Sequence, residues 1–256
     1  MDLEIRNKSA LILGGSAGLG LGAAKALVAE GVRVVLVGRD LEKARIASAE
    51  LNGTAVSCDL ANPVDVAGLV PRALQALGKI DILILNGGGP PPMPAAVFDA
   101  REWRSQFESI VLSLINVATH CLEGMRSRGF GRIILVSSTS IVEPIPGLVL
   151  SNALRAGLRG WAKTLASEVA RDGVTVNILM PGRILTDRTL RLDMLEAQET
   201  GVEAAEVSRA SQAEIPIGRY GTPDEFGALV AFLCSSRAAY ITGTSIPVDG
   251  GLMRST

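Results

Sequence analysis

The sequence predicts an α/β protein, a single domain built on one doubly wound parallel sheet of about seven strands. Short apolar runs alternate with helical patterns along all 256 residues. This alternation is typical of parallel strands that are covered by helices on both faces and joined by right-handed crossovers. Hydrophobic residues make up 48% of the chain and charged residues 20%, a balance that favours one large buried core over disorder.

The first unit of this alternation contains a cluster of glycines. An apolar run over residues 10–13 predicts a strand, and residues 23–30 predict a helix that ends at Gly31. Between the two lie Gly14, Gly15, Gly18, Gly20 and Gly22. Glycine lets the backbone approach a ligand closely, and the N-terminus of the following helix attracts a phosphate. A strand, a glycine turn and a helix in this order indicate a dinucleotide-binding site.

The remaining elements follow in chain order. Strands are predicted over residues 32–37, 54–57, 80–85, 133–136, 174–179 and 245–248, and helices over residues 41–51, 63–77, 101–128, 150–170 and 223–235. Asp40 is expected to cap the first of these helices, and Pro63 is expected to open the second. Pro71 is expected to kink or split that second helix.

Residues 183–217 break the alternation. They form a long insertion at the carboxyl end of a strand, which predicts a lid over a ligand site. Leu190, Met194 and Ala197 have the spacing of one apolar helix face within this insertion.

Composition argues against several classes of partner. The 25 basic and 26 acidic residues nearly cancel, and aromatic residues make up 4%, so a nucleic-acid partner is not expected. No apolar run is long enough to span a membrane, and the N-terminus lacks the apolar core of a signal peptide, so a cytoplasmic protein is expected. Cys58, Cys121 and Cys234 lie far apart and predict neither a metal site nor a disulfide framework.

Polar and glycine-rich segments follow the predicted strands at their carboxyl ends. Besides the glycine turn, these segments include Asp59, Asn86, Ser138 and Pro181–Gly182. Ligands of such sheets bind at this edge, so these segments are expected to converge on one crevice.

At these positions the chain resembles the short-chain dehydrogenase/reductase family. The segment LGGSAGLG is similar to the family motif T-G-x-x-x-G-x-G, with Leu13 in place of threonine, and Cys58-Asp59-Leu60 resembles the family's adenine-binding segment. Leu85-Asn86-Gly87-Gly88 stands at the motif N-N-A-G, Pro181-Gly182 with Thr186 resembles P-G-x-x-x-T, and residues 240–251 are close to a family signature.

The resemblance implies a Rossmann fold, an NAD(P) site, a small carbonyl or alcohol substrate, and a homotetramer or homodimer formed through the long helices. It implies cofactor contacts from Gly14, Ser16, Gly18, Leu19, Gly20, Arg39, Asp59, Leu60, Asn86, Gly87, Arg155, Pro181, Gly182, Ile184 and Thr186. Arg39 favours NADP over NAD, because no acid stands at Val37 or Gly38 and arginine pairs with a 2′-phosphate. The alternative is a solvated Arg39 paired with Asp40 or Glu42.

The catalytic positions depart from the family pattern of serine, tyrosine, lysine and asparagine. Ser138 retains the serine, but Ser151 stands for tyrosine, Arg155 for lysine and Ile110 for asparagine. An aliphatic hydroxyl is a poorer general acid than a phenol, and a guanidinium does not readily exchange a proton. The spacing places neither Tyr220 nor Tyr240 at the site, and His120 is expected to be a packing or surface residue.

Two functions are therefore open. The first is an atypical NADP-dependent reductase of the 3-oxoacyl-[acyl-carrier-protein] reductase type, with Ser138, Ser151 and Arg155 at a degenerate catalytic centre. The second is a non-catalytic NADP-binding sensor or assembly protein on the same fold. Arg183 either binds an anionic substrate group or pairs with a lid carboxylate such as Asp187.

Overall fold

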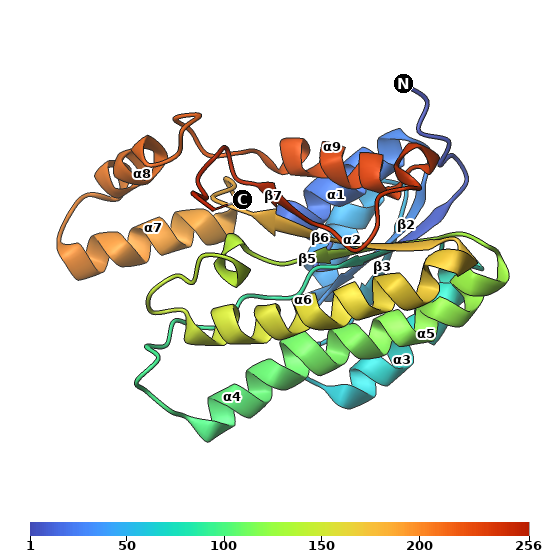
Figure 1. Cartoon of the computed structure of the whole chain (residues 1–256), viewed down its shortest axis with the longest axis horizontal. Helices are drawn as coiled ribbons and strands as arrows, with labels where there is room; N and C mark the ends of the chain where they lie inside the picture. Colours follow the sequence, from blue (N-terminus) through green and yellow to red (C-terminus); the bar gives the residue numbers. More distant parts are fainter. Residues whose placement is uncertain (256) are drawn as a thin grey trace.

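The computed structural model describes residues 1–255 and contains one parallel sheet of seven strands (Figure 1). The strands are β1 (Ser9–Leu13), β2 (Arg33–Gly38), β3 (Thr54–Ser57), β4 (Ile82–Leu85), β5 (Gly131–Val136), β6 (Val174–Pro181) and β7 (Ser245–Val248). Their order across the sheet is β3-β2-β1-β4-β5-β6-β7. The chain therefore adds strands on one side of β1 as far as β3, then crosses back to β4 and continues on the other side. The predicted fold class is confirmed.

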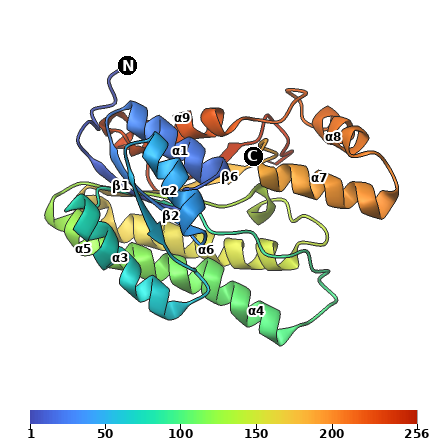
Figure 2. The ribbon, with the colours of Figure 1, turned by 180° about the vertical axis from the view of Figure 1, so that it is seen from behind.

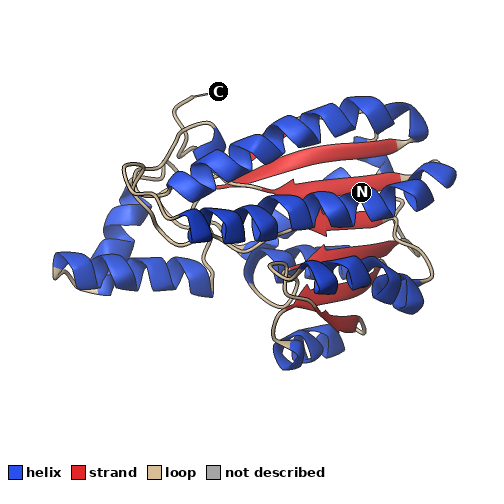
Figure 3. Ribbon diagram, turned by 90° about the horizontal axis from the view of Figure 1, so that it is seen from below, coloured by secondary structure: helices blue, strands red, loops and turns tan. Residues whose placement is uncertain are grey.

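Helices cover both faces of this sheet, as Figures 1 and 3 show. They are α1 (Gly18–Ala29), α2 (Leu41–Glu50), α3 (Pro63–Leu77), α4 (Ala100–Phe107), α5 (Ser113–Ser127), α6 (Val149–Val169), α7 (Asp187–Thr200), α8 (Ala204–Ala213) and α9 (Pro223–Cys234). One core cluster buries Leu69, Leu114 and Leu158 of α3, α5 and α6. The other buries Leu27 of α1 and Phe226 of α9. The continuous apolar runs of the strands follow from this burial on both sides.

The predicted helix starts are confirmed, and two helix predictions need correction. The Asp40 carboxylate accepts the N–H of Lys43 at 3.0 Å, and α3 begins at Pro63. This helix continues through Pro71 as one element, so the predicted split at Pro71 does not occur. The helix predicted over residues 101–128 is interrupted by a π-helical turn, η1 (Glu108–Leu112), between α4 and α5. Hydrophobic spacing could not reveal one extra residue in a turn, and such turns are frequent at functional sites.

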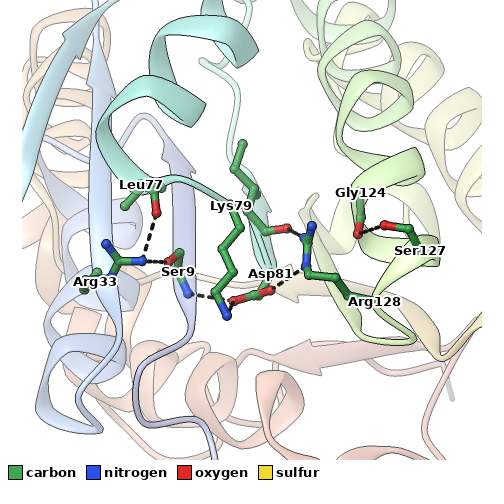
Figure 4. Close-up of polar contacts among 9 residues, drawn as sticks. Ser9, Arg33, Leu77, Lys79, Asp81, Gly124, Ser127 and Arg128 are labelled. Carbon is green, nitrogen blue, oxygen red and sulfur yellow. Dashed lines mark hydrogen bonds and ion pairs between the residues drawn. The ribbon is translucent and has the colours of Figure 1, made fainter.

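A buried carboxylate ties the amino ends of the strands together, at the edge of the sheet opposite to the ligand edge (Figure 4). Asp81, directly before β4, has a side chain only 1% exposed and pairs with Lys79 at 3.1 Å and with Arg128 at 3.2 Å. It also accepts the backbone N–H of Ser9 at 3.1 Å. This network joins β1, β4 and the end of α5.

Residues 183–217 contain α7 and α8, which project beyond the sheet in both views of the ribbon (Figures 1 and 2). Leu190, Met194 and Ala197 lie in α7 as predicted, and Leu190 and Met194 of this apolar face are exposed. The residue of α7 that is buried is Asp193. Its carboxylate contacts the Arg183 guanidinium and the Tyr220 hydroxyl. No helix within residues 1–255 combines the length and apolar character needed to cross a membrane.

Candidate active site

The glycine turn leaves space and free donors at the start of α1. Gly14 and Gly18 have φ angles of 58° and 52°, a region that favours glycine. A Cβ on Gly20 would overlap the carbonyl of Gly14. Helix α1 begins after Ala17 with no capping side chain and no acid in its first turn. Its first N–H groups are thus available to an anion, and the turn fits the pyrophosphate of a dinucleotide.

Two other segments contact this turn. The Asn86 amide, after β4, donates to the carbonyl of Gly14 at 3.4 Å, and a Cβ on Gly14 would lie 2.7 Å from the same amide nitrogen. Thr186 is the N-cap of α7, and a Cβ on Gly18 would lie 3.3 Å from its methyl group. The structure therefore brings together the ends of β1 and β4 and the start of the lid.

The end of β2 supplies the residues predicted for the adenosine half of a cofactor. A Cβ on Gly38 would lie 3.0 Å from the Ser16 hydroxyl, so these two residues are adjacent. Arg39 is exposed and has no ion pair within residues 1–255. Asp40 caps α2 and Glu42 pairs with Arg45. The alternative that Arg39 pairs with one of these two acids is therefore wrong.

The four positions that resemble the family's catalytic residues converge on α6. Ser151 and Arg155 lie in α6, which packs against both the π-helical turn that carries Ile110 and the short 3₁₀ helix η2 (Thr139–Ile141) that follows Ser138. The Ser138 hydroxyl accepts the N–H of Ser140 at 3.1 Å. Ile110 is buried in the core, where it cannot donate or accept a hydrogen bond through its side chain.

Arg155 is a buried cation without a carboxylate partner among the described residues. Its Nη1 donates to the carbonyl of Val136 at 3.1 Å and its Nη2 to that of Gly88 at 3.0 Å. Burial, together with the charge of Arg188, lowers the pKa of Arg155 to about 10. The guanidinium therefore stays charged at neutral pH, and the end of β5 and the loop after β4 hold it in place.

The base of the lid resolves the two alternatives for Arg183. Its guanidinium lies 3.2 Å from the Asp193 carboxylate, and the Tyr220 hydroxyl donates to the same carboxylate at 2.9 Å. Asp187, the example given for such a lid carboxylate, pairs instead with Lys43 at 3.7 Å. Tyr220 thus holds α7 against the body of the protein, a contact that sequence spacing could not indicate because Asp193 and Tyr220 are 27 positions apart.

The remaining candidates do not join this crevice. His120 is exposed, with its ring Nδ1 2.8 Å from the carbonyl of Asn116, and Tyr240 is fully exposed. The three cysteines are free and buried, and burial raises the pKa of Cys58 to about 11 and of Cys121 and Cys234 to about 12. Their thiols are therefore protonated at neutral pH. Residues 1–255 contain no His, Cys, Asp and Glu cluster suited to a metal ion.

Sequence reasoning missed one pair of residues at the edge of the crevice. A Cβ on Gly89, after β4, would overlap the guanidinium of Arg188, the second residue of α7. A signal was present, because three successive glycines exceed what the family motif needs. Only the fold, however, places residues 89 and 188 side by side.

Comparison with known proteins agrees with this geometry. A family model described as enoyl-(acyl carrier protein) reductase matches residues 14–253. A 3-oxoacyl-[acyl-carrier-protein] reductase of Vibrio cholerae is 33% identical over 252 residues, which cover 98% of this chain and 99% of that protein. A D-beta-hydroxybutyrate dehydrogenase of Cupriavidus necator is also 33% identical, over 96% of this chain and 98% of that protein.

Solved structures give the same result. The L-sorbose reductase of Gluconobacter frateurii, in complex with NADPH and L-sorbose, is similar with a TM-score of 0.93 and 32% identity over 100% of both chains. YwfH, an NADPH-dependent reductase involved in bacilysin biosynthesis, has a TM-score of 0.92 and 26% identity over 97% of this chain and 99% of that chain. Together with the glycine turn and the residues gathered around α6, these matches show that the chain belongs to the short-chain dehydrogenase/reductase family.

Proposed function

We propose that this protein is an NADP-dependent reductase of carbonyl compounds, with Ser138, Ser151 and Arg155 in place of the family's usual catalytic set. One observation carries the proposal. The Arg155 guanidinium is buried without a counter-ion and held by the carbonyls of Val136 and Gly88, beside the loops that form the cofactor crevice. Two NADPH-dependent reductases with closely similar folds support the choice of cofactor.

The cofactor would bind along the carboxyl edge of the sheet. Its pyrophosphate would lie on the N-terminus of α1, and a 2′-phosphate would pair with the unpaired Arg39. The proposed contacts are Gly14, Ser16, Gly18, Leu19, Gly20, Arg39, Asp59, Leu60, Asn86, Gly87, Arg155, Pro181, Gly182, Ile184 and Thr186. NADPH, when bound, supplies the hydride.

The side chains around α6 would act on the substrate carbonyl by charge and hydrogen bonding. The hydroxyls of Ser138 and Ser151 can donate hydrogen bonds to the carbonyl oxygen, and Arg155 supplies a permanent positive charge that stabilises a developing alkoxide. None of these groups has a pKa near neutrality, so the proton comes from water. Loss of a general acid typically costs about 10²–10⁴-fold in rate, so slow turnover of activated carbonyls is expected.

A two-stage measurement tests this function. Fluorescence titration measures NADPH binding, and absorbance at the NADPH band then measures its oxidation with a panel of ketones, 3-oxo acids and 3-oxoacyl thioesters. Tight binding with slow turnover of one substrate class is the expected result. Tight binding with no turnover would favour a non-catalytic NADP-binding sensor or assembly protein, and no affinity for either coenzyme would exclude both.

Restoring the usual pair gives a second test. The double substitution Ser151→Tyr with Arg155→Lys is expected to raise any reductase activity about 10²-fold or more, because a phenol beside an ammonium can donate the proton. Ser151→Phe with Arg155→Lys is the matched control, since it adds the ring without the hydroxyl. Equal activity of the two double variants would contradict a missing-acid explanation.

We also propose that residues 183–217 act as a lid and that the protein forms a homodimer or homotetramer through its long helices. The lid is joined to the body by a short bridge between Ile184 and Gly221, which supports motion as a unit. Ala153, Gly157 and Gly160 of α6 are exposed and could allow close packing against a second copy. Light scattering during gel filtration measures the oligomeric state.

A further inference from the structure

Two arginines from different elements lie on the glycine segment that follows β4. Arg155 of α6 donates to the carbonyl of Gly88 at 3.0 Å. The guanidinium of Arg188 lies on Gly89 so closely that a Cβ there would overlap its Cζ, Nη1 and Nη2. Arg155 has its place at the proposed cofactor and carbonyl site, whereas Arg188 has no role in the chemistry described above.

The absence of a side chain at residue 89 serves this arginine. Gly89 is not among the glycines with positive φ, so its backbone conformation is open to any residue. The three nearest atoms that a Cβ at this position would meet all belong to the Arg188 guanidinium, which would have to move away from the loop. The loop after β4 is therefore shaped to seat the charged end of Arg188.

The acids nearest to this part of the lid are already paired with other cations. Asp193 pairs with Arg183, Asp187 with Lys43, and Glu225 with Arg219 just beyond the lid. Within residues 1–255, Arg188 and Arg191 have neither an ion pair nor a hydrogen bond from their guanidinium groups. Arg188 is exposed as a whole, but partial desolvation of its guanidinium and the charge of Arg191 lower its pKa.

These two arginines line an open groove of about 390 Å³ between the loop and α7, a volume in the range of small-molecule sites. Residues 89–91 form one wall, and Arg188, Arg191, Leu192 and Leu195 form the other. No acidic residue lines the groove. Its surface therefore combines two guanidinium groups with proline and leucine side chains.

We infer that this groove binds the substrate, and that the substrate is an oxo acid whose carboxylate pairs with Arg188 and Arg191 while its apolar chain contacts Leu192 and Leu195. This inference rests on the proposed function for the position of the carbonyl. Guanidinium groups bind carboxylates through paired hydrogen bonds. The cofactor's own phosphates are accounted for by the N-terminus of α1 and by Arg39, which leaves the groove for the substrate.

Binding of simple probes tests the groove without requiring turnover. Calorimetric titration of the full-length protein, alone and with NADPH, compares hexanoate with methyl hexanoate, which has the same chain but no charge. Hexanoate is expected to bind at least about tenfold more tightly than the ester, since a charge-assisted pair contributes about 1.5–3 kcal/mol. Equal affinities of acid and ester would overturn the inference.

Variants locate the charge. Arg188→Gln and Gly89→Ala are each expected to weaken hexanoate about tenfold or more and to leave methyl hexanoate unchanged. Arg209→Gln, an exposed arginine on α8 away from the groove, is the matched control. Hexanoate affinity that survives Arg188→Gln, or falls as much in Arg209→Gln, would contradict a specific site.

A parallel titration with NADPH separates this inference from the proposed function. Arg188→Gln is expected to bind NADPH as the wild-type protein does. If NADPH affinity falls by the same factor as hexanoate affinity, Arg188 binds a cofactor phosphate and the inference is wrong. If NADPH binds neither protein but hexanoate still discriminates between them, the proposed function fails and the anion groove stands.

Discussion

Arg155, which we propose stands in place of the family's lysine, is held by the fold through its guanidinium. A lysine ammonium changes its pKa readily on burial and can pass a proton, whereas a guanidinium stays charged and donates in a fixed plane. In this protein two of its N–H groups are committed to the carbonyls of Val136 and Gly88. Even with its pKa lowered to about 10 by burial, the Arg155 guanidinium stays charged at neutral pH.

Removal of this charge should weaken cofactor binding. Arg155→Met keeps an apolar chain of similar shape but leaves the two backbone carbonyls without donors. We expect the dissociation constant for NADPH to rise about tenfold, because the proposed charge-assisted hydrogen bond from Arg155 to the cofactor is lost. Such a bond contributes about 1.5–3 kcal/mol. Arg155→Lys keeps the charge and should lose less, as measured by the same fluorescence titration. Unchanged NADPH affinity in Arg155→Met would show that Arg155 does not contact the cofactor.

At the scale of elements, the lid is held by one buried carboxylate. Asp193 in the middle of α7 binds Arg183 at the lid's beginning and Tyr220 just after its end. Two backbone hydrogen bonds also join the two ends of this segment. The Gly221 N–H donates to the Arg183 carbonyl at 3.0 Å, and the Leu185 N–H donates to the Gly221 carbonyl at 2.8 Å. The two ends of the segment are thus joined, and α7 is attached to that junction while its outer face stays exposed.

Asp193→Ala should release the lid without unfolding the protein. The substitution leaves the Arg183 guanidinium and the Tyr220 hydroxyl unpaired, at a cost of about 1–3 kcal/mol to the closed arrangement. We expect cleavage within residues 187–213 during limited proteolysis to accelerate about tenfold or more, as followed by mass spectrometry. Asp187→Ala, which removes only the exposed pair with Lys43, is the control and should leave the cleavage rate unchanged.

Helix α9 begins with a capping box that makes its stability depend on pH. The Glu225 carboxylate accepts the N–H of Thr222 and pairs with Arg219. The hydrogen bond from Arg219, and to a smaller extent that from Thr222, lowers the pKa of Glu225 to about 2. Because the folded pKa lies below the unfolded value of about 4.3, the stabilisation is present above that value. It is lost as the pH falls toward 2.

Glu225→Gln should therefore remove a pH-dependent part of the stability. We expect the difference in free energy of unfolding between wild type and variant to be constant above about pH 5 and to shrink as the pH falls toward 2. Urea unfolding at a series of pH values measures it. Glu50→Gln, at the exposed end of α2, is the control. A difference that does not change with pH would contradict the role of the Glu225 charge.

At the scale of the whole molecule, the carboxyl ends and the amino ends of the strands carry different kinds of residues. The carboxyl edge gathers glycines, hydroxyls and unpaired arginines, which suit a ligand. The amino ends of the strands are held together by Asp81, which pairs with Lys79 and Arg128 and accepts the Ser9 N–H (Figure 4). A buried carboxylate with three partners joins β1, β4 and α5 and should contribute to global stability.

Asp81→Asn tests that contribution. The amide keeps the shape but loses the charge, and its NH₂ group faces donors, so we expect the free energy of unfolding to fall by about 2–3 kcal/mol. Asp172→Asn breaks a more exposed pair with Arg126 and should cost at most about 1 kcal/mol. Denaturant titration compares the two variants. A similar small loss in both would mean that the Asp81 network is energetically a surface pair.

Most of the fold and part of the site could be predicted because their signals are local. Strand β7 spans the four predicted residues, and Asp40 and Pro63 mark helix starts as expected. Such features depend on hydrophobic spacing, caps and backbone freedom within a few residues. The interruption of the helix over residues 101–128 was missed because a π-helical turn changes hydrogen bonding without changing composition.

The sequence by itself determined the α/β class and the position of the glycine turn, since both depend on residue type and short spacing. Only the tertiary structure decided which charges meet. Arg183 pairs with Asp193 rather than Asp187, Arg39 has no ion pair within the described residues 1–255, and the Arg188 guanidinium lies against Gly89. Charge pairing acts through space, and the fold brings together side chains whose separation along the chain carries no information about their contact.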